Sequence, residues 1–136
     1  MVEPSIFTQI RLGKIPGEIL YQDEYVFVIM TIAPHNPGHC LVIPVDEIPD
    51  FEALPDSLFD RVMHLAKMIA QVQKRLYGCP KVALAVAGME VDHTHIHIYP
   101  LYAESDMNPA AAQHPPVSEI RAEANKLRAA IQGHTV

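Results

Sequence analysis

The chain has 136 residues, of which 49% are hydrophobic and 19% charged, and its formal net charge is −6. This size and composition predict one globular domain over residues 1–136 and exclude a disordered chain. No apolar run could span a membrane, no N-terminal segment resembles a secretory signal, and no Lys/Arg cluster suits a nucleic-acid backbone. The two cysteines, Cys40 and Cys79, lack metal-site spacing, so we expect reduced, buried thiols in a cytoplasmic protein.

The first half of the chain has the pattern of β-structure. An apolar anchor at residues 4–12 precedes a loop rich in Gly and Pro. Residues 18–21 and 25–30 are predicted to form a β-hairpin, since the second run is rich in β-branched and aromatic residues. Residues 39–44 are predicted to form a third strand, apolar enough for the centre of a sheet.

The longest predicted element is a helix between an N-cap at Asp56 and a C′ residue at Gly78. Its apolar side chains recur every three or four positions and form one stripe, made of Leu58, Val62, Leu65, Ile69, Val72 and Leu76. A fourth strand is expected at residues 81–86. A last helix is expected from a cap at Ser118 through Ile131.

Three histidines stand at alternate positions within residues 91–100, namely His93, His95 and His97. This period of two predicts a fifth strand with the imidazoles on one face and Ile96 and Ile98 on the other. Five strands with helices between and after them predict an α+β domain with an antiparallel sheet.

Two kinds of chemistry use several imidazoles on one face. In the first, a neutral His95 attacks phosphorus and forms a covalent intermediate. Its other ring nitrogen then needs an acceptor that fixes the tautomer, and a protonated neighbour would stabilise the phosphoryl oxygens. In the second, the histidines hold a zinc ion with an open coordination position. The spacing alone does not separate these alternatives.

Two separate motifs resemble the histidine triad (HIT) family of nucleotidyl hydrolases and transferases. Residues 37–44, Pro-Gly-His-Cys-Leu-Val-Ile-Pro, are similar to one family segment, and His-x-His-x-His at residues 93–97 is similar to the signature. Residues 5–24 also resemble the family's N-terminal pattern. The resemblance implies a HIT-like fold with a five-stranded antiparallel sheet, two main helices and pairing into a homodimer.

The resemblance also implies a role for each matching residue. His95 matches the nucleophile, His93 and His97 the outer triad members, and His39 a fourth histidine beside them. Gly88 matches a glycine whose backbone helps to orient the nucleophile. The family passes a nucleoside monophosphate from a phosphoramidate or phosphoanhydride to histidine and then to water. We therefore expect a purine nucleotide substrate and neither a cofactor nor a metal ion.

The chain departs from the family pattern at several positions. Thr31 stands where an Asp or Asn often grips the ribose, and Met89 replaces a glutamine after the glycine. Ser5 and Thr8 stand where some bacterial members carry the Cys-x-x-Cys of a structural zinc site, and both are poor zinc ligands.

An apolar cleft for the base is implied as well, with the candidates Phe7, Ile10, Ile15, Val28 and Ile32. His35 is a further candidate near His39. Three hypotheses remain at this point: a phosphoramidase or dinucleoside-polyphosphate hydrolase, a nucleotide-binding module with weak turnover, and a metal-dependent hydrolase. The residues Thr31 and Met89 motivate the second.

Overall fold

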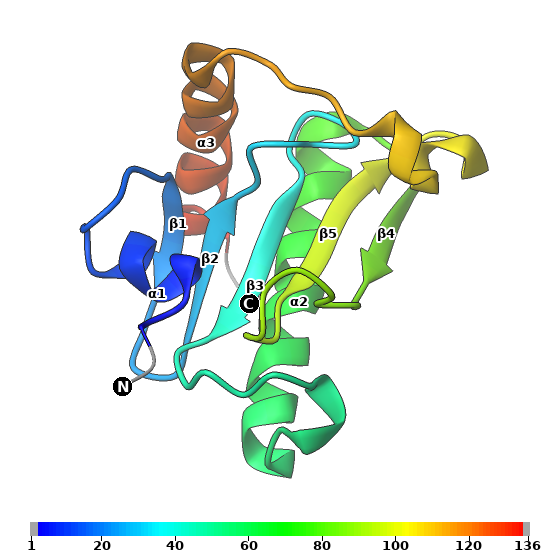
Figure 1. Cartoon of the computed structure of the whole chain (residues 1–136). Helices are drawn as coiled ribbons and strands as arrows, with labels where there is room; N and C mark the ends of the chain where they lie inside the picture. The colour runs from blue at the N-terminus through cyan, green and yellow to red at the C-terminus, as the bar shows by residue number, and fades with distance from the viewer. Residues whose placement is uncertain (1–2, 135–136) are drawn as a thin grey trace.

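The chain folds into one five-stranded β-sheet with helices packed against it (Figure 1). The computed structural model describes residues 3–134, so the first two and last two residues of the predicted domain lie outside it. The strands lie in the order β1-β2-β3-β5-β4, and every neighbouring pair is antiparallel, which confirms the predicted α+β class. They are β1 (Ile19–Gln22), β2 (Val26–Met30), β3 (Cys40–Pro44), β4 (Lys81–Ala85) and β5 (Ile96–Leu101).

Two long helices, α2 (Asp56–Tyr77) and α3 (Val117–Gln132), pack behind the sheet in the view of Figure 1. Their inward side chains form one apolar cluster with alternate residues of the strands, as the predicted stripe requires. Leu76 is an exception, because it is 38% exposed and Tyr77 packs against the cluster at that end of α2.

Both long helices begin after a proline rather than at the predicted polar caps. Pro55 and Pro116 occupy the N-cap positions, so Asp56 and Ser118 lie in the first turns. The proline ring fixes φ near the value that leads into a helix, and neither proline makes a side-chain cap bond. The predicted end of α2 is confirmed, because Gly78 adopts φ of +64° and donates its N–H to a last-turn carbonyl.

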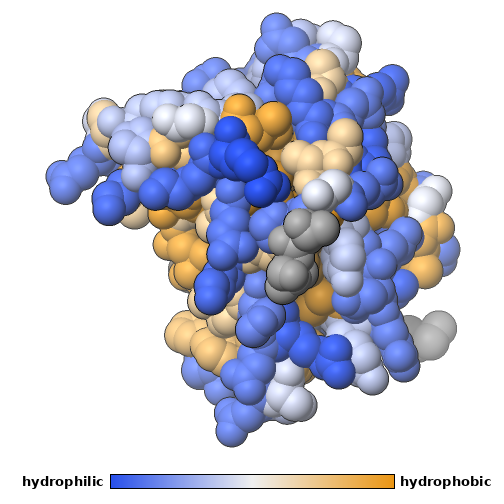
Figure 2. Space-filling view, turned by 180° about the vertical axis from the view of Figure 1, so that it is seen from behind, coloured by the Kyte–Doolittle hydropathy of each residue, from blue (hydrophilic) through white to orange (hydrophobic). Residues whose placement is uncertain are grey.

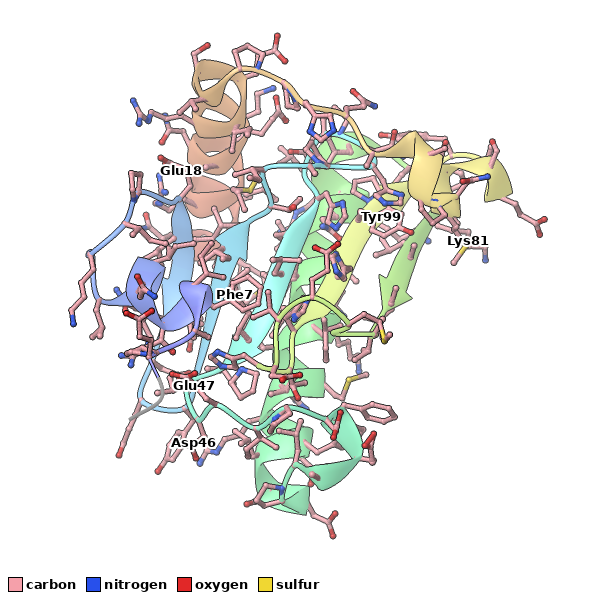
Figure 3. All side chains as sticks on the ribbon, viewed as in Figure 1. Phe7, Glu18, Asp46, Glu47, Lys81 and Tyr99 are labelled. Atoms are coloured by element: carbon pink, nitrogen blue, oxygen red, sulfur yellow. The ribbon has the colours of Figure 1, made fainter. Side chains whose placement is uncertain are left out.

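The opposite face of the sheet carries the short helix α1 (Ile6–Arg11) and the loops that follow β2 and β4 (Figure 1). Ser5 caps α1, since its Oγ accepts the backbone N–H of Thr8 at 3.2 Å. Phe7 reaches from α1 over the sheet (Figure 3) and packs against a second apolar cluster formed by Phe27, Ile29, Leu41 and Ile43. This front face therefore has an apolar floor at the β2–β3 side.

Strand β5 begins at Ile96, five residues later than the predicted start at residue 91. The backbone N–H and the Oγ1 of Thr94 both donate to the carbonyl of Ile48, at 2.8 and 2.7 Å. These bonds hold the segment before β5 against the loop after β3, where it cannot pair with a strand. His95 thus precedes the sheet ladder, although its backbone was expected to lie within it.

Both cysteines are free and buried, as predicted. Within residues 3–134, no helix has the length and apolar character that a membrane crossing needs.

Candidate active site

Four histidines and two other aromatic rings form a continuous row on the front face of the sheet. The ring centroids are 4.7 Å apart for Phe7 and His95, and 5.2 Å for His95 and His97. They are 5.1 Å apart for His97 and His39, and 4.5 Å for His39 and Tyr99. His35 ends the row, 4.8 Å from the Tyr99 ring. Residues from α1, the loop between β2 and β3, the segment before β5 and β5 itself thus meet at one place.

The two isoleucines on either side of His97 confirm the predicted alternation on β5. Ile96 and Ile98 are buried in the cluster beneath α2 and α3, on the side of the sheet away from the histidine row. Because successive side chains of a strand point to opposite faces, His97 and Tyr99 share the front face. The apolar residues therefore fix which face carries the imidazoles.

One ring nitrogen of His95 is hydrogen bonded, and the other has no hydrogen-bond partner among residues 3–134. Its Nδ1 lies 2.8 Å from the carbonyl oxygen of His93, which can only accept a hydrogen bond. The proton of a neutral His95 therefore sits on Nδ1, and Nε2 keeps its lone pair. The acceptor predicted to fix the tautomer is thus the backbone carbonyl of His93. Phe7 packs against this ring, which is 8% exposed.

His39 and His97 form a hydrogen-bonded pair whose tautomers follow from their surroundings. The backbone N–H of His35 donates to His39 Nδ1 at 3.0 Å, so that nitrogen must be unprotonated. The proton of a neutral His39 is then on Nε2, which donates to His97 Nδ1 at 2.9 Å. A neutral His97 consequently carries its proton on Nε2. The pair presents one N–H donor to the front face.

Burial keeps this pair neutral. Desolvation lowers the pKa of His39 to about 3, and the neighbouring charges of His97 and His35 add to the effect. Desolvation likewise lowers the pKa of His97 to about 4, with contributions from His95 and His35. The expected protonated neighbour is therefore absent from the ligand-free site near pH 7. A neutral His97 still offers one hydrogen bond, and a bound phosphate anion would raise its pKa.

The depressed pKa values of His39 and His97 predict an acid-sensitive fold. Both groups stay neutral in the folded chain but become protonated near pH 6.5 when it unfolds, so protons favour the unfolded state. Their contribution is complete above pH 6.5 and is lost as the pH falls toward 4. We expect the free energy of unfolding, measured in urea, to drop by roughly 1–3 kcal/mol between pH 7 and pH 5, allowing for partial solvation of His97.

A matched pair of variants tests whether the histidine pair causes this pH dependence of stability. His39→Asn should flatten the dependence of unfolding free energy on pH, whereas His64→Gln, at an exposed position on α2, should leave it unchanged. Equal slopes for His39→Asn and the unmodified chain would contradict the assignment.

His93, expected as an outer triad member, has both ring nitrogens hydrogen bonded to other parts of the protein. Its Nε2 donates to the carbonyl of Pro44 at 2.7 Å, and its Nδ1 is hydrogen bonded to Ser5 Oγ. The side chain is 0% exposed, and desolvation lowers its pKa. His93 therefore joins α1 to the end of β3, and its backbone carbonyl orients His95.

The positions of the possible zinc site hold a hydrogen-bonded cluster instead. Glu47 accepts the backbone N–H of Ser5 and the hydroxyl of Thr8, both at 2.9 Å (Figure 3). Ser5 is in turn bonded to His93. Among residues 3–134, no three His, Cys, Asp or Glu side chains converge in a way that could hold a metal ion. Within the triad, both ring nitrogens of His93 and the Nδ1 atoms of His95 and His97 are hydrogen bonded to other protein groups.

The predicted substrate-binding residues differ in their exposure and in their surroundings. Phe7 lies in the ring row, whereas Ile32 and Met89 are 78% and 92% exposed. The hydroxyl of Thr31 accepts the N–H of Ala33 at 3.2 Å, and this local turn occupies one side of it. Gly88 adopts φ of +76° in the loop between β4 and β5, a conformation that favours glycine.

The five predicted cleft residues do not all share one face of the sheet. Val28 was wrongly assigned to the cleft, because it is buried in the cluster beneath α2 and α3. Ile10 packs beside Phe7 on the front face, where Ile29 also lies. The alternation along β2 could have replaced Val28 by Ile29, since neighbouring residues of a strand face opposite ways.

Two residues of the site, one in the row and one that supports it, were not singled out from the sequence. Tyr99 lies two residues after His97, so the same period of two places it on the histidine face. Asp106 lies in the segment after β5; its carbonyl is bonded to His35 Nδ1 at 2.6 Å and its carboxylate accepts from Asn36 at 3.1 Å. These bonds hold the loop whose N–H sets the tautomer of His39.

Comparisons with known proteins identify the family of this chain. The HIT domain matches residues 13–104. The chain is 37% identical to an uncharacterized HIT-like protein of Methanocaldococcus jannaschii, over 71% of this chain and 78% of that protein. It is 32% identical to the purine nucleoside phosphoramidase of Escherichia coli, over 72% of this chain and 87% of that protein.

A solved structure extends the similarity to the whole fold. The crystal structure of a HIT-like protein from Bartonella henselae matches with a TM-score of 0.83 and 26% identity, and covers 96% of this chain and 98% of that one. The sheet is thus the HIT-like fold that the two sequence motifs predicted. Motifs, fold and sequence similarity together show that the chain belongs to the HIT family.

Proposed function

We propose that this protein hydrolyses a purine nucleoside phosphoramidate or a dinucleoside polyphosphate through a covalent intermediate on His95. The observation that carries the proposal is the Nδ1–H bond from His95 to the carbonyl of His93, which leaves Nε2 as a free nucleophile. The E. coli relative, a purine nucleoside phosphoramidase, supports this substrate class.

The reaction has two steps. His95 Nε2 attacks the α-phosphorus, the bond to the leaving group breaks, and the leaving group takes a proton. His97 supplies that proton from Nε2, after the bound phosphate has raised its pKa. Water then attacks the phosphorus of the adduct and gives one proton back to His97, which releases the nucleoside monophosphate and restores both histidines. No cofactor, metal ion or nucleic acid takes part in this scheme, which we place in the cytoplasm.

A turnover assay with adenosine phosphoramidate and with diadenosine polyphosphates tests the proposal. Release of AMP that persists in EDTA supports the histidine nucleophile. Binding of the nucleotide without turnover would instead favour a catalytically weak binding module, which the exposed Met89 and the locally bonded Thr31 motivate. Activity that depends on bound zinc would favour the metal-dependent hydrolase.

We also propose a homodimer formed along the free edge of β4. This strand pairs with β5 on one side only in the described sheet, and its Leu84 is 44% exposed. Figure 2 shows apolar surface along this edge, at the left of the view. A second copy would cover both the unpaired backbone groups and the apolar side chains.

Light scattering at micromolar concentration should therefore give the mass of two 15.1 kDa chains. Leu84→Lys should shift the protein toward a monomer, whereas Leu12→Lys, at an exposed position beside α1, should not. A monomer mass for the unmodified chain would contradict the dimer.

A further inference from the structure

Helix α2 carries one buried polar side chain toward the sheet. Gln73 is fully buried, and the other buried residues of α2 are all apolar: Leu58, Val62, Leu65, Ala66, Ile69 and Val72. A glutamine in such an environment must satisfy its amide group or lose free energy. Its hydrogen bonds therefore indicate what it does there.

The amide nitrogen of Gln73 bridges two backbone carbonyls. Nε2 donates to Gly38 O at 2.9 Å and to Ile98 O at 3.0 Å, and lies 3.6 Å from Cys40 Sγ. Because both carbonyl oxygens can only accept, the NH₂ end of the side chain must face them. The Oε1 atom is buried and has no partner among the described residues. The two hydrogen bonds of the amide nitrogen thus fix the side chain, although its Oε1 acceptor stays unsatisfied.

Both carbonyls belong to neighbours of the hydrogen-bonded histidine pair. Gly38 directly precedes His39, and Ile98 directly follows His97, whose Nδ1 is 2.9 Å from His39 Nε2 on the other face of the sheet. The register between β3 and β5 runs from Val42 only as far as Cys40, opposite Ile98. Gln73 therefore joins the two chain segments at the point where the strand ladder stops.

We propose that Gln73 is a positioning residue that holds His39 against His97 from behind the sheet. The amide fixes the separation of the two segments, and this separation sets the bond through which His39 directs the proton of His97 to Nε2. The effect on rate rests on the proposed function, whereas the effect on the histidine pair does not.

The test compares Gln73→Met, which keeps side-chain volume but removes both donors, with the packing control Val72→Ala on the same helix. Nitrogen-15 and proton NMR would follow the His39 Nε2–H signal and the tautomer of His97. We expect Gln73→Met to lose or shift that signal and to lower kcat on the order of 10- to 100-fold, with KM within about twofold. Val72→Ala should leave the NMR signal in place.

The NMR signal separates the outcomes. A Gln73→Met protein that keeps the His39 signal unshifted would overturn the proposal, and so would an equal loss of the signal in Val72→Ala at matched stability. If the unmodified chain shows no turnover, the proposed function fails, but the NMR comparison still decides the role of Gln73. If Gln73→Met does not fold, Gln73→Leu provides the same comparison without donors.

Discussion

Replacing His95 with alanine should lower the rate of AMP release from adenosine phosphoramidate by about 10⁴-fold or more. The loss is large because the free Nε2 is the only atom of this side chain placed to attack phosphorus, and the covalent route disappears with it. The measurement is steady-state turnover combined with intact-mass analysis of protein trapped with substrate. The unmodified chain should gain the mass of one nucleotidyl group, and His95→Ala should not.

Two further variants distinguish the loss of the nucleophile from a loss of activity caused by misfolding. His95→Gly opens a cavity beside Phe7 that free imidazole can enter, so added imidazole should restore part of the rate. His64→Gln, exposed on α2, should react like the unmodified chain. A folded His95→Ala protein that hydrolyses the substrate at a near-normal rate would refute the nucleophile assignment.

Removing the donor of His97 should lower the rate by roughly 10²–10⁴-fold, the range expected for a general acid. His97→Asn is the informative variant, because its Oδ1 can still accept from His39 while the Nε2–H is lost. The rate loss should grow with the basicity of the leaving group, since a basic leaving group needs the proton most. A series of adenosine phosphoramidates and phosphate esters with leaving groups of different pKa would measure this dependence.

The complementary variant His97→Gln keeps the hydrogen-bond donor and removes the acceptor. Its amide can donate near the position of Nε2, but it no longer accepts from His39. It should therefore retain more activity with poor leaving groups than His97→Asn. Rate losses that are equal for all leaving groups in both variants would show that His97 positions the substrate and does not transfer a proton.

The alternation of side chains along β5 was the most reliable signal in the sequence. It placed Ile96 and Ile98 in the core and His97 on the opposite face, because successive side chains of a strand point to opposite faces of the sheet. The same rule applied to Tyr99 would have found another member of the row. Local periodicity thus predicts the faces of a strand well.

Contacts between distant parts of the chain explain what the sequence did not predict. Thr94 bonds to Ile48, and His93 bonds to Pro44 and Ser5, across 46, 49 and 88 positions of sequence. The last two partners occupy both ring nitrogens of His93, and no spacing rule within residues 91–100 predicts them. Gln73 was not identified from the sequence for the same reason, since its acceptors lie in the turn before β3 and on β5.

The bond between Ser5 and His93 has a practical consequence for handling this protein. It connects the N-terminus of α1 to the residue whose carbonyl orients His95, the proposed nucleophile. Glu47 also accepts the backbone N–H of Ser5, so this start is held at two points. An affinity tag or a proteolytic cut close to residue 5 would disturb catalysis without touching a catalytic residue. Recombinant material for kinetics should accordingly carry its tag at the other terminus.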